Sequence, residues 1–316
     1  MRHAHARLDA RLRVPRRVPR AVRQPTMQSV KLGHTNDNIS AIGFGGMPLS
    51  IQGRPSEDVG RSVIHAAIDA GMTCIDTADV YCLDDSEIGH NERLIAGALR
   101  ERPDRDRVRV ATKAGLRRPR GEWTRDGSPR HIREACQQSL RSLQTDQIFL
   151  YQLHAVDPRV GLEKSVETLA ELQREGKCRH VGLSNVSILQ IEAARLIVEI
   201  VSVQNRLNPF FRESLEDGVV QYCEDEKITF LAYSPVGGGR LAKKLPKIPV
   251  MESLSKKYGA SPHAIAIAWV RAQGETVVPI PAARKPEHAI DSARAVDIVL
   301  APEDLALIGE TEFSRS

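Results

Sequence analysis

The sequence predicts a (β/α)8 TIM barrel over residues 27–316, with a short N-terminal hairpin in front of the first barrel strand. Short apolar runs typical of strands alternate eight times with amphipathic helical stretches, within about 260 residues. The strand-like runs are almost continuously apolar, as parallel strands buried on both faces must be. Because no linker divides this pattern, we expect one barrel domain and not a doubly wound sheet.

The predicted elements follow one another in a regular order. The segment 30–39 predicts a hairpin with its turn near Asn36-Asp37. Apolar runs bounded by turn residues predict the strands, at 39–45, 73–80, 108–113, 148–154, 180–184, 200–204, 229–234 and 277–281. Amphipathic spacing, with Gly71 or Gly176 after a helix end and Pro129 at a helix start, predicts the helices, at 56–70, 91–100, 129–143, 162–175, 188–198, 215–227, 250–258, 262–272 and 287–295, with a last helix from Pro302.

The cysteines and the apolar runs indicate the compartment. Five cysteines, odd in number and without CxxC spacing, predict reduced thiols in a chain that shows no secretory h-region. No apolar run approaches the length of a membrane span. We therefore expect a cytoplasmic protein without a membrane partner.

The first 26 residues differ from the rest of the chain. They carry eight Arg and one Asp, a charge of +7, which leaves −2 for the remainder of a chain whose total is +5. The barrel therefore has no electrostatic reason to bind nucleic acid. Residues 1–26 are rich in Arg, Pro and Ala without apolar periodicity, so we expect disorder. They are either a transit-like or anionic-surface-binding segment or an upstream extension with Met27 as the effective start, which we favour.

Four ionisable residues stand at the ends of three consecutive predicted strands. Asp76 and Tyr81 follow one apolar run, Lys113 closes the next, and His154 closes the third. The steps of 37 residues from Asp76 to Lys113 and of 41 from Lys113 to His154 each match one strand-helix repeat. Because the carboxyl ends of barrel strands open into one mouth, we expect all four side chains to meet there.

These side chains suit proton transfer to a carbonyl oxygen. The phenol of Tyr81 has an ordinary pKa near ~10, and we expect the ammonium of Lys113 to lower it. Asp76 can orient Lys113, and His154 can donate a hydrogen bond to the substrate oxygen. No serine nucleophile elbow, pair of carboxylates or His-x-His metal cluster competes with this interpretation, and we predict no metal. None of the four residues supplies electrons, so a hydride-donating cofactor is required.

The later strand ends provide a place for that cofactor. Ser184, Asn185 and Gln204 offer amides and a hydroxyl to a nicotinamide carboxamide, and Tyr233 could stack on the ring. The loop 234–240 is glycine-rich enough for its backbone to approach a pyrophosphate, and no GxGxxG motif indicates a Rossmann site. Basic residues around the next helix start suit a 2′-phosphate. The predicted cofactor-binding residues are Gly46, Met47, Ser184, Asn185, Gln204, Tyr233, Ser234, Pro235, Gly237, Arg284, Lys285 and His288.

Short motifs in this order and spacing resemble the aldo-keto reductase family over nearly all of 30–300. They are IDTADVY, ATKAG, YQLH, GLSN, a strand-ending Gln, AYSP and PIPAARKPEH. The resemblance implies a barrel that reduces aldehydes and ketones with NADPH. It matches Asp76, Tyr81, Lys113 and His154 to the catalytic tetrad and places Asp291 near an adenine-contacting acid. The usual Pro-Gly after the eighth strand is Pro281-Ala282 here, and the usual Glu-Asn is Asp291-Ser292.

The predicted function is NADP(H)-dependent reduction of a small carbonyl compound, with Tyr81 as the general acid. The alternative is a catalytically silent barrel that binds NADPH as a redox sensor or partner subunit. A metal-dependent hydrolase is disfavoured. We expect a monomer or a weak oligomer.

Overall fold

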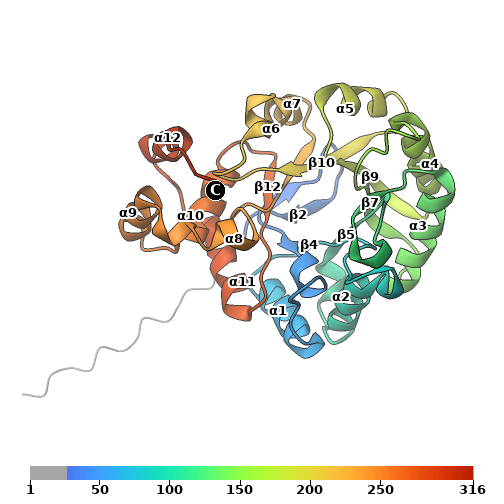
Figure 1. The fold of residues 1–316 in the computed structure, drawn as a ribbon, viewed down its shortest axis with the longest axis horizontal. Helices are drawn as coiled ribbons and strands as arrows, with labels where there is room; N and C mark the ends of the chain where they lie inside the picture. Colours follow the sequence, from blue (N-terminus) through green and yellow to red (C-terminus); the bar gives the residue numbers. More distant parts are fainter. Residues whose placement is uncertain (1–26, 316) are drawn as a thin grey trace, which may run out of the picture.

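Eight parallel strands form the central barrel of the computed structural model, which describes residues 27–315 (Figure 1). Each strand pairs in parallel with the next one around the sheet. The barrel strands are β3 (Phe44–Gly45), β4 (Cys74–Asp76), β5 (Arg109–Ala114), β8 (Ile148–Leu153), β9 (Cys178–Ser184), β10 (Ile200–Arg206), β11 (Thr229–Tyr233) and β12 (Val277–Ile280). The predicted fold class is confirmed.

Two glycines allow the first and last strands to close the barrel. The amide of Gly43 donates to the carbonyl oxygen of Pro279 at 3.0 Å, and that of Gly45 donates to Pro281 at 2.9 Å. A Cβ at Gly43 would lie 2.9 Å from a methyl of Ile280, and a Cβ at Gly45 would lie 3.0 Å from the Ile280 carbonyl oxygen. Side chains at these two positions would push the closing strands apart.

Helices surround the barrel because each buries one apolar face against the strands. In α1, for example, Val63, Ile64, Ala67 and Ile68 are buried, and the Ser56 hydroxyl caps the first turn. Figure 1 shows α1 to α5 following the barrel wall in chain order. The helices are α1 (Glu57–Asp69), α2 (His90–Arg100), α3 (Pro129–Leu143), α4 (Leu162–Arg174), α5 (Ile188–Arg195), α6 (Glu213–Glu216), α7 (Val219–Asp225), α8 (Gly239–Ala242), α9 (Pro249–Tyr258), α10 (Pro262–Arg271), α11 (Pro286–Ala293) and α12 (Pro302–Glu310).

The N-terminal hairpin closes one end of the barrel. Its strands β1 (Ser29–Lys31) and β2 (Asn38–Ser40) pair antiparallel. Leu32 and Ile39 are buried in one cluster with side chains from the barrel interior, among them Cys74, Leu150, Leu231 and Val278. The hairpin therefore completes the inner core below the strand ends.

Several segments differ from the sequence prediction. The predicted strand 39–45 is divided, because residues 39–40 belong to the hairpin strand β2 and only Phe44–Gly45 form the barrel strand β3. The predicted helix 215–227 is divided into α6 and α7, because Gly218 adopts a left-handed φ of 77° between them. The predicted strand 73–80 ends at Asp76, and residues 77–81 turn into a loop. A small hairpin of β6 (Leu116–Arg117) and β7 (Thr124–Arg125) was not predicted. The tail prediction lies outside the described residues.

No helix among residues 27–315 combines the length and the apolar composition that crossing a bilayer requires. All five cysteines are buried and none is in a disulfide.

We predict that Leu32→Ala lowers the free energy of unfolding by about 2–5 kcal/mol, as large-to-small changes in packed cores do. Leu32 is fully buried, whereas Leu196 is 90% exposed, so Leu196→Ala is the matched control. Urea or thermal unfolding of both variants measures the difference. Equal stability of the two variants would show that the hairpin adds little to the core.

Candidate active site

Lys113 is the buried centre of the site. Its Nζ donates to Asp76 Oδ2 at 2.7 Å, to the Thr77 carbonyl oxygen at 2.9 Å and to the Tyr81 hydroxyl at 3.0 Å. The register of β4 and β5 pairs Asp76 with Ala111, so Lys113 lies two residues further toward the carboxyl end. That offset puts the ammonium within reach of the loop that carries Tyr81.

His154 completes the group that the sequence predicted. It follows β8, and its backbone amide donates to the carbonyl oxygen of Ala114 at 2.8 Å. The imidazole and the Tyr81 ring lie 5.7 Å apart between centroids and almost perpendicular to each other. The structure therefore brings Asp76, Tyr81, Lys113 and His154 to one mouth of the barrel.

Burial and neighbouring groups together set the charge states of Tyr81 and Lys113. Burial raises the pKa of Tyr81 to about 12, although the ammonium of Lys113 acts to lower it. The expected net lowering was wrong, because the sequence pattern did not reveal that Tyr81 is almost fully buried. Burial acts to lower the pKa of Lys113, but Asp76 and Tyr81 outweigh it and the net pKa is raised. At neutral pH the pair is a neutral phenol beside an ammonium.

His154 is a neutral imidazole. Burial, with a smaller contribution from Lys113, holds its pKa well below the ordinary value. Its Nδ1 is buried and has no hydrogen-bond partner among the described residues. A proton on Nδ1 would be an unpaired buried donor, so the favoured tautomer carries the proton on Nε2.

The predicted carboxamide-binding residues form one hydrogen-bonded network. Asn185 donates to Ser184 Oγ at 3.0 Å and to the His154 carbonyl oxygen at 2.9 Å, and it accepts from the Tyr233 hydroxyl at 2.9 Å. Gln204 Nε2 donates to Asp76 Oδ1 at 2.7 Å. Within residues 27–315, no hydrogen bond to Gln204 Oε1 is made, which leaves it available to a ligand amide.

The loop after β11, predicted to bind the pyrophosphate, has several residues with positive φ. Ser234, Gly237, Gly238 and Gly239 have φ values of 51°, 84°, 67° and 44°, a run of left-handed conformations that favours glycine. A Cβ at Gly239 would meet nothing within 4 Å, so there is room for a ligand to approach the backbone. Gly237 has a packing role, because a Cβ there would lie 2.9 Å from Leu241 and Phe210.

Gly46 and Met47 lie at the end of β3, beside the tetrad. The Gly46 amide donates to the Asp76 carbonyl oxygen at 2.8 Å. A Cβ at Gly46 would lie 2.4 Å from Asn91 Oδ1, so α2 already requires glycine there. Met47 packs against the small cluster that contains Tyr81.

Arg284 and Lys285 lie just after β12, on the exposed rim. Arg284 donates to the carbonyl oxygens of Pro48 at 3.3 Å and Gln52 at 3.1 Å, which links the rim across to the loop after β3. Lys285 lies 3.9 Å from Glu287, at the N-cap of α11. Both cations are accessible to an anionic ligand.

The other two predicted rim residues differ in their contacts. His288 is exposed in the first turn of α11. Asp291 accepts a 2.5 Å hydrogen bond from the Ser261 hydroxyl, which caps α10. The structure therefore gives Asp291 a helix-capping partner that the sequence did not indicate.

Sequence reasoning missed Trp123, which lies in the β6–β7 hairpin. Its ring centroid lies 6.3 Å from that of Tyr81 and 6.4 Å from that of His154. A Trp in a short polar loop carries no periodic signal, so only the folded hairpin reveals its position.

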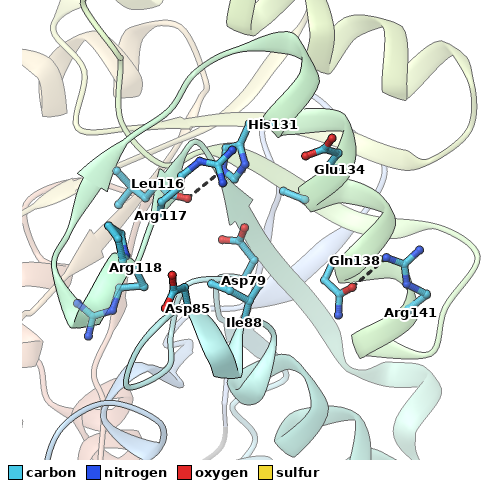
Figure 2. A pocket seen from close by; sticks show the side chains of 12 residues that line it. Asp79, Asp85, Ile88, Leu116, Arg117, Arg118, His131, Glu134, Gln138 and Arg141 are labelled. Atoms are coloured by element: carbon cyan, nitrogen blue, oxygen red, sulfur yellow. Dashed lines mark hydrogen bonds between the residues drawn. The ribbon is translucent and has the colours of Figure 1, made fainter.

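A separate pocket of about 400 Å³ lies beside the loop between β4 and α2 (Figure 2). Its lining comes from that loop, from the β6–β7 hairpin and from α3. Figure 2 shows Asp79 pointing into it, and burial raises the pKa of this carboxyl well above its ordinary value. Asp76, Tyr81, Lys113 and His154 do not line this pocket, so the strand-end site and the pocket are distinct.

Comparison with known proteins identifies the class of protein that this barrel and site define. The family model described as "Aldo/keto reductase family" matches residues 41–312. The chain therefore belongs to the aldo/keto reductase family, whose members are NADP(H)-dependent oxidoreductases.

Individual relatives agree with this assignment. A probable aldo-keto reductase 1 of Glycine max is 34% identical over 91% of this chain and 89% of its own. An uncharacterised oxidoreductase of Schizosaccharomyces pombe is 32% identical, over 86% of each chain. Among solved structures, a glycerol dehydrogenase from Gluconobacter oxydans has a TM-score of 0.78 at 28% identity, covering 89% of this chain and 94% of its own. An aldo-keto reductase from Klebsiella pneumoniae in complex with NADPH has a TM-score of 0.73 at 28% identity, with the same coverage.

We predict that the His154 ring does not titrate near the ordinary histidine pKa of about 6.5. Because its pKa is lowered, the ring is already neutral below that pH and stays neutral above it. Nitrogen-15 NMR of histidine-labelled protein, with His154→Gln to assign the signal, should show a proton on Nε2 from pH 6 to 8. A signal that shifts through this range would mean that His154 becomes a cation and can act as an acid.

Proposed function

We propose that this protein is an NADPH-dependent reductase of small aldehydes or ketones, in the alcohol dehydrogenase class that acts on CH–OH groups. The single observation that carries the proposal is the contact of 3.0 Å between the Tyr81 hydroxyl and the buried Lys113 ammonium. The ammonium reduces the cost of forming the phenolate when Tyr81 gives up its proton, although burial keeps the net pKa near 12.

Tyr81 gives its proton to the carbonyl oxygen. NADPH supplies the hydride to the carbonyl carbon when it is bound, so the products are an alcohol and NADP⁺. With its pKa near 12, Tyr81 is protonated at neutral pH and ready to act as the acid. The phenolate that it leaves behind faces the ammonium of Lys113, which offsets the cost of a buried negative charge.

His154 and Asp76 position the reacting groups. The Nε2–H of the neutral imidazole is free to donate to the carbonyl oxygen, which directs that oxygen toward Tyr81. Asp76 uses one oxygen for Lys113 and the other for Gln204, at 2.7 Å each. With both oxygens engaged, the carboxylate is held toward Lys113, and Gln204 links the cofactor side of the mouth to the proton donor.

The cofactor is held along the later strand ends. Gln204 Oε1, Ser184 and Asn185 would hold the nicotinamide carboxamide, and Tyr233 would stack on the ring. The loop 234–239, which contains Ser234, Pro235 and Gly237, would hold the pyrophosphate through its backbone.

The rim residues select the phosphorylated form of the cofactor. Arg284, Lys285 and His288 would hold the 2′-phosphate of NADPH, a charged group that NADH lacks. Asp291 would lie near the adenosine part of the cofactor. Its carboxylate is held there by the hydroxyl of Ser261, the N-cap residue of α10.

The remaining assignments follow from the same proposal. Residues 27–316 are the catalytic unit, and the first 26 residues are not needed for reduction. The substrate is a small molecule, and nucleic acid is not a partner. The protein works in the cytoplasm as a monomer or weak oligomer. The complete Asp76–Lys113–Tyr81 contact supports an enzyme over a silent NADPH-binding barrel, which would not need it.

We predict that Tyr81→Phe slows carbonyl reduction by at least ~100-fold, as expected for the loss of a general acid. The ring is retained, so the dissociation constant of NADPH, measured by fluorescence titration, should change little. Tyr222→Phe is the matched control, because the Tyr222 hydroxyl contacts Arg195 on the surface. Full activity in Tyr81→Phe would refute the proposed acid, and wild-type protein that oxidises no NADPH with any aldehyde or ketone would favour the silent barrel.

A further inference from the structure

Trp123 is an aromatic side chain that lies beside the proton donor and is open to solvent, with its ring centroid 6.3 Å from that of Tyr81. Its side chain is 47% exposed. The rings of Tyr81, His154 and Trp123 lie 5.7 to 6.4 Å apart between centroids, with interplanar angles of 70° to 81°. The three rings are close to perpendicular to one another. Two of them, Tyr81 and His154, are the groups that would hold a carbonyl oxygen.

Arg118 holds the indole in this position. Its guanidinium carbon lies 4.0 Å from the centroid of Trp123 and covers one ring face. The side chain is 1% exposed and donates to the carbonyl oxygens of Gly121 at 2.5 Å and of Cys82 and Leu83 at 3.1 Å. These bonds fix Arg118 to the same loop that carries Tyr81.

Arg118 is a buried cation without an acidic partner. Within the described part of the chain, its side-chain partner is the Gln52 amide oxygen at 3.4 Å and not a carboxylate, and its Nε has no hydrogen-bond partner. Figure 2 shows that Arg118 also lines the separate pocket beside α3. Burying a charge without an ionic partner is costly, and the carbonyl oxygens of Gly121, Cys82 and Leu83 together with the Trp123 ring are what stabilise this one.

The part of Trp123 that Arg118 does not cover is available to a substrate. Arg118 covers one face of the ring, and the side chain as a whole is still 47% exposed, so part of its remaining surface is open to a ligand. Because Trp123 lies 6.3 Å from Tyr81 and 6.4 Å from His154, a substituent of a carbonyl held by those two groups would be within reach of the indole. A planar, apolar substituent would gain ring contact there, whereas a chain of hydroxyl groups would lose water contacts.

We propose that Trp123 determines substrate specificity, favouring carbonyl compounds with an aromatic ring next to the carbonyl, and that Arg118 is its positioning residue. This inference rests on the proposed reductase function and deepens it by naming a substrate class. No periodic pattern in the sequence indicates either residue.

The first test compares benzaldehyde with glyceraldehyde as substrates for NADPH oxidation. Trp123→Ala should lower kcat/KM for benzaldehyde about tenfold or more, mostly through KM, with a clearly smaller loss for glyceraldehyde. Trp123→Phe should restore most of the preference because it keeps a ring. Equal losses for both substrates in Trp123→Ala, or none for either, would overturn the proposal.

The second test separates positioning from charge. Arg118→Met removes the stacked cation and should reduce the benzaldehyde preference severalfold, whereas Arg125→Met removes an exposed cation of the same hairpin and should not. An equal effect of both variants would mean that hairpin charge, and not the stacking, sets the preference.

A third measurement does not depend on turnover. The chain has two tryptophans, and Trp269 is 2% exposed, with its indole N–H bonded to Leu305. In a Trp269→Phe background, acrylamide should quench Trp123 more strongly after Arg118→Met, because the covered face is released. Unchanged quenching would overturn the role of Arg118. Wild-type protein that reduces neither aldehyde would defeat the reductase proposal itself, an outcome distinct from a lost preference.

Discussion

The ammonium of Lys113 is the interaction on which the rest of the site depends. A fully buried cation is stable only if its partners are fixed, since removing one partner of a buried pair leaves an uncompensated charge. Asp76, the Thr77 carbonyl oxygen and Tyr81 supply those partners within 3.0 Å. The carboxylate in turn is held by Gln204 from the opposite side of the barrel. This series of hydrogen bonds connects β4, β5 and β10 around the Lys113 ammonium.

The barrel provides the rigidity that this charge requires. Strand register places Lys113 beyond Asp76, and the closing hydrogen bonds at Gly43 and Gly45 keep β3 and β12 from separating. The N-terminal hairpin fills the other end with Leu32 and Ile39. The packing of the barrel core therefore fixes the positions of the strand ends that carry the functional side chains, as in other barrels of this architecture.

The sequence predicted what depends on periodicity and strand order. Alternating apolar runs gave the barrel, and residues at strand ends gave the four side chains around Lys113. It could not predict contacts that arise only on closure. The bond from Gln204 to Asp76 joins residues 128 positions apart, and Trp123 stands in a hairpin without an apolar pattern. The pKa of Tyr81 was misjudged for the same reason, because its burial depends on side chains from several elements.

The most direct test of this account is a double-mutant cycle on Lys113 and Tyr81, measured as kcat for carbonyl reduction at saturating NADPH. If Lys113 acts through Tyr81, Lys113→Met should slow turnover strongly in the wild-type background and add little to Tyr81→Phe, because groups that act as a unit are not additive. Fully additive losses would contradict the account and assign Lys113 a separate role, such as holding the cofactor.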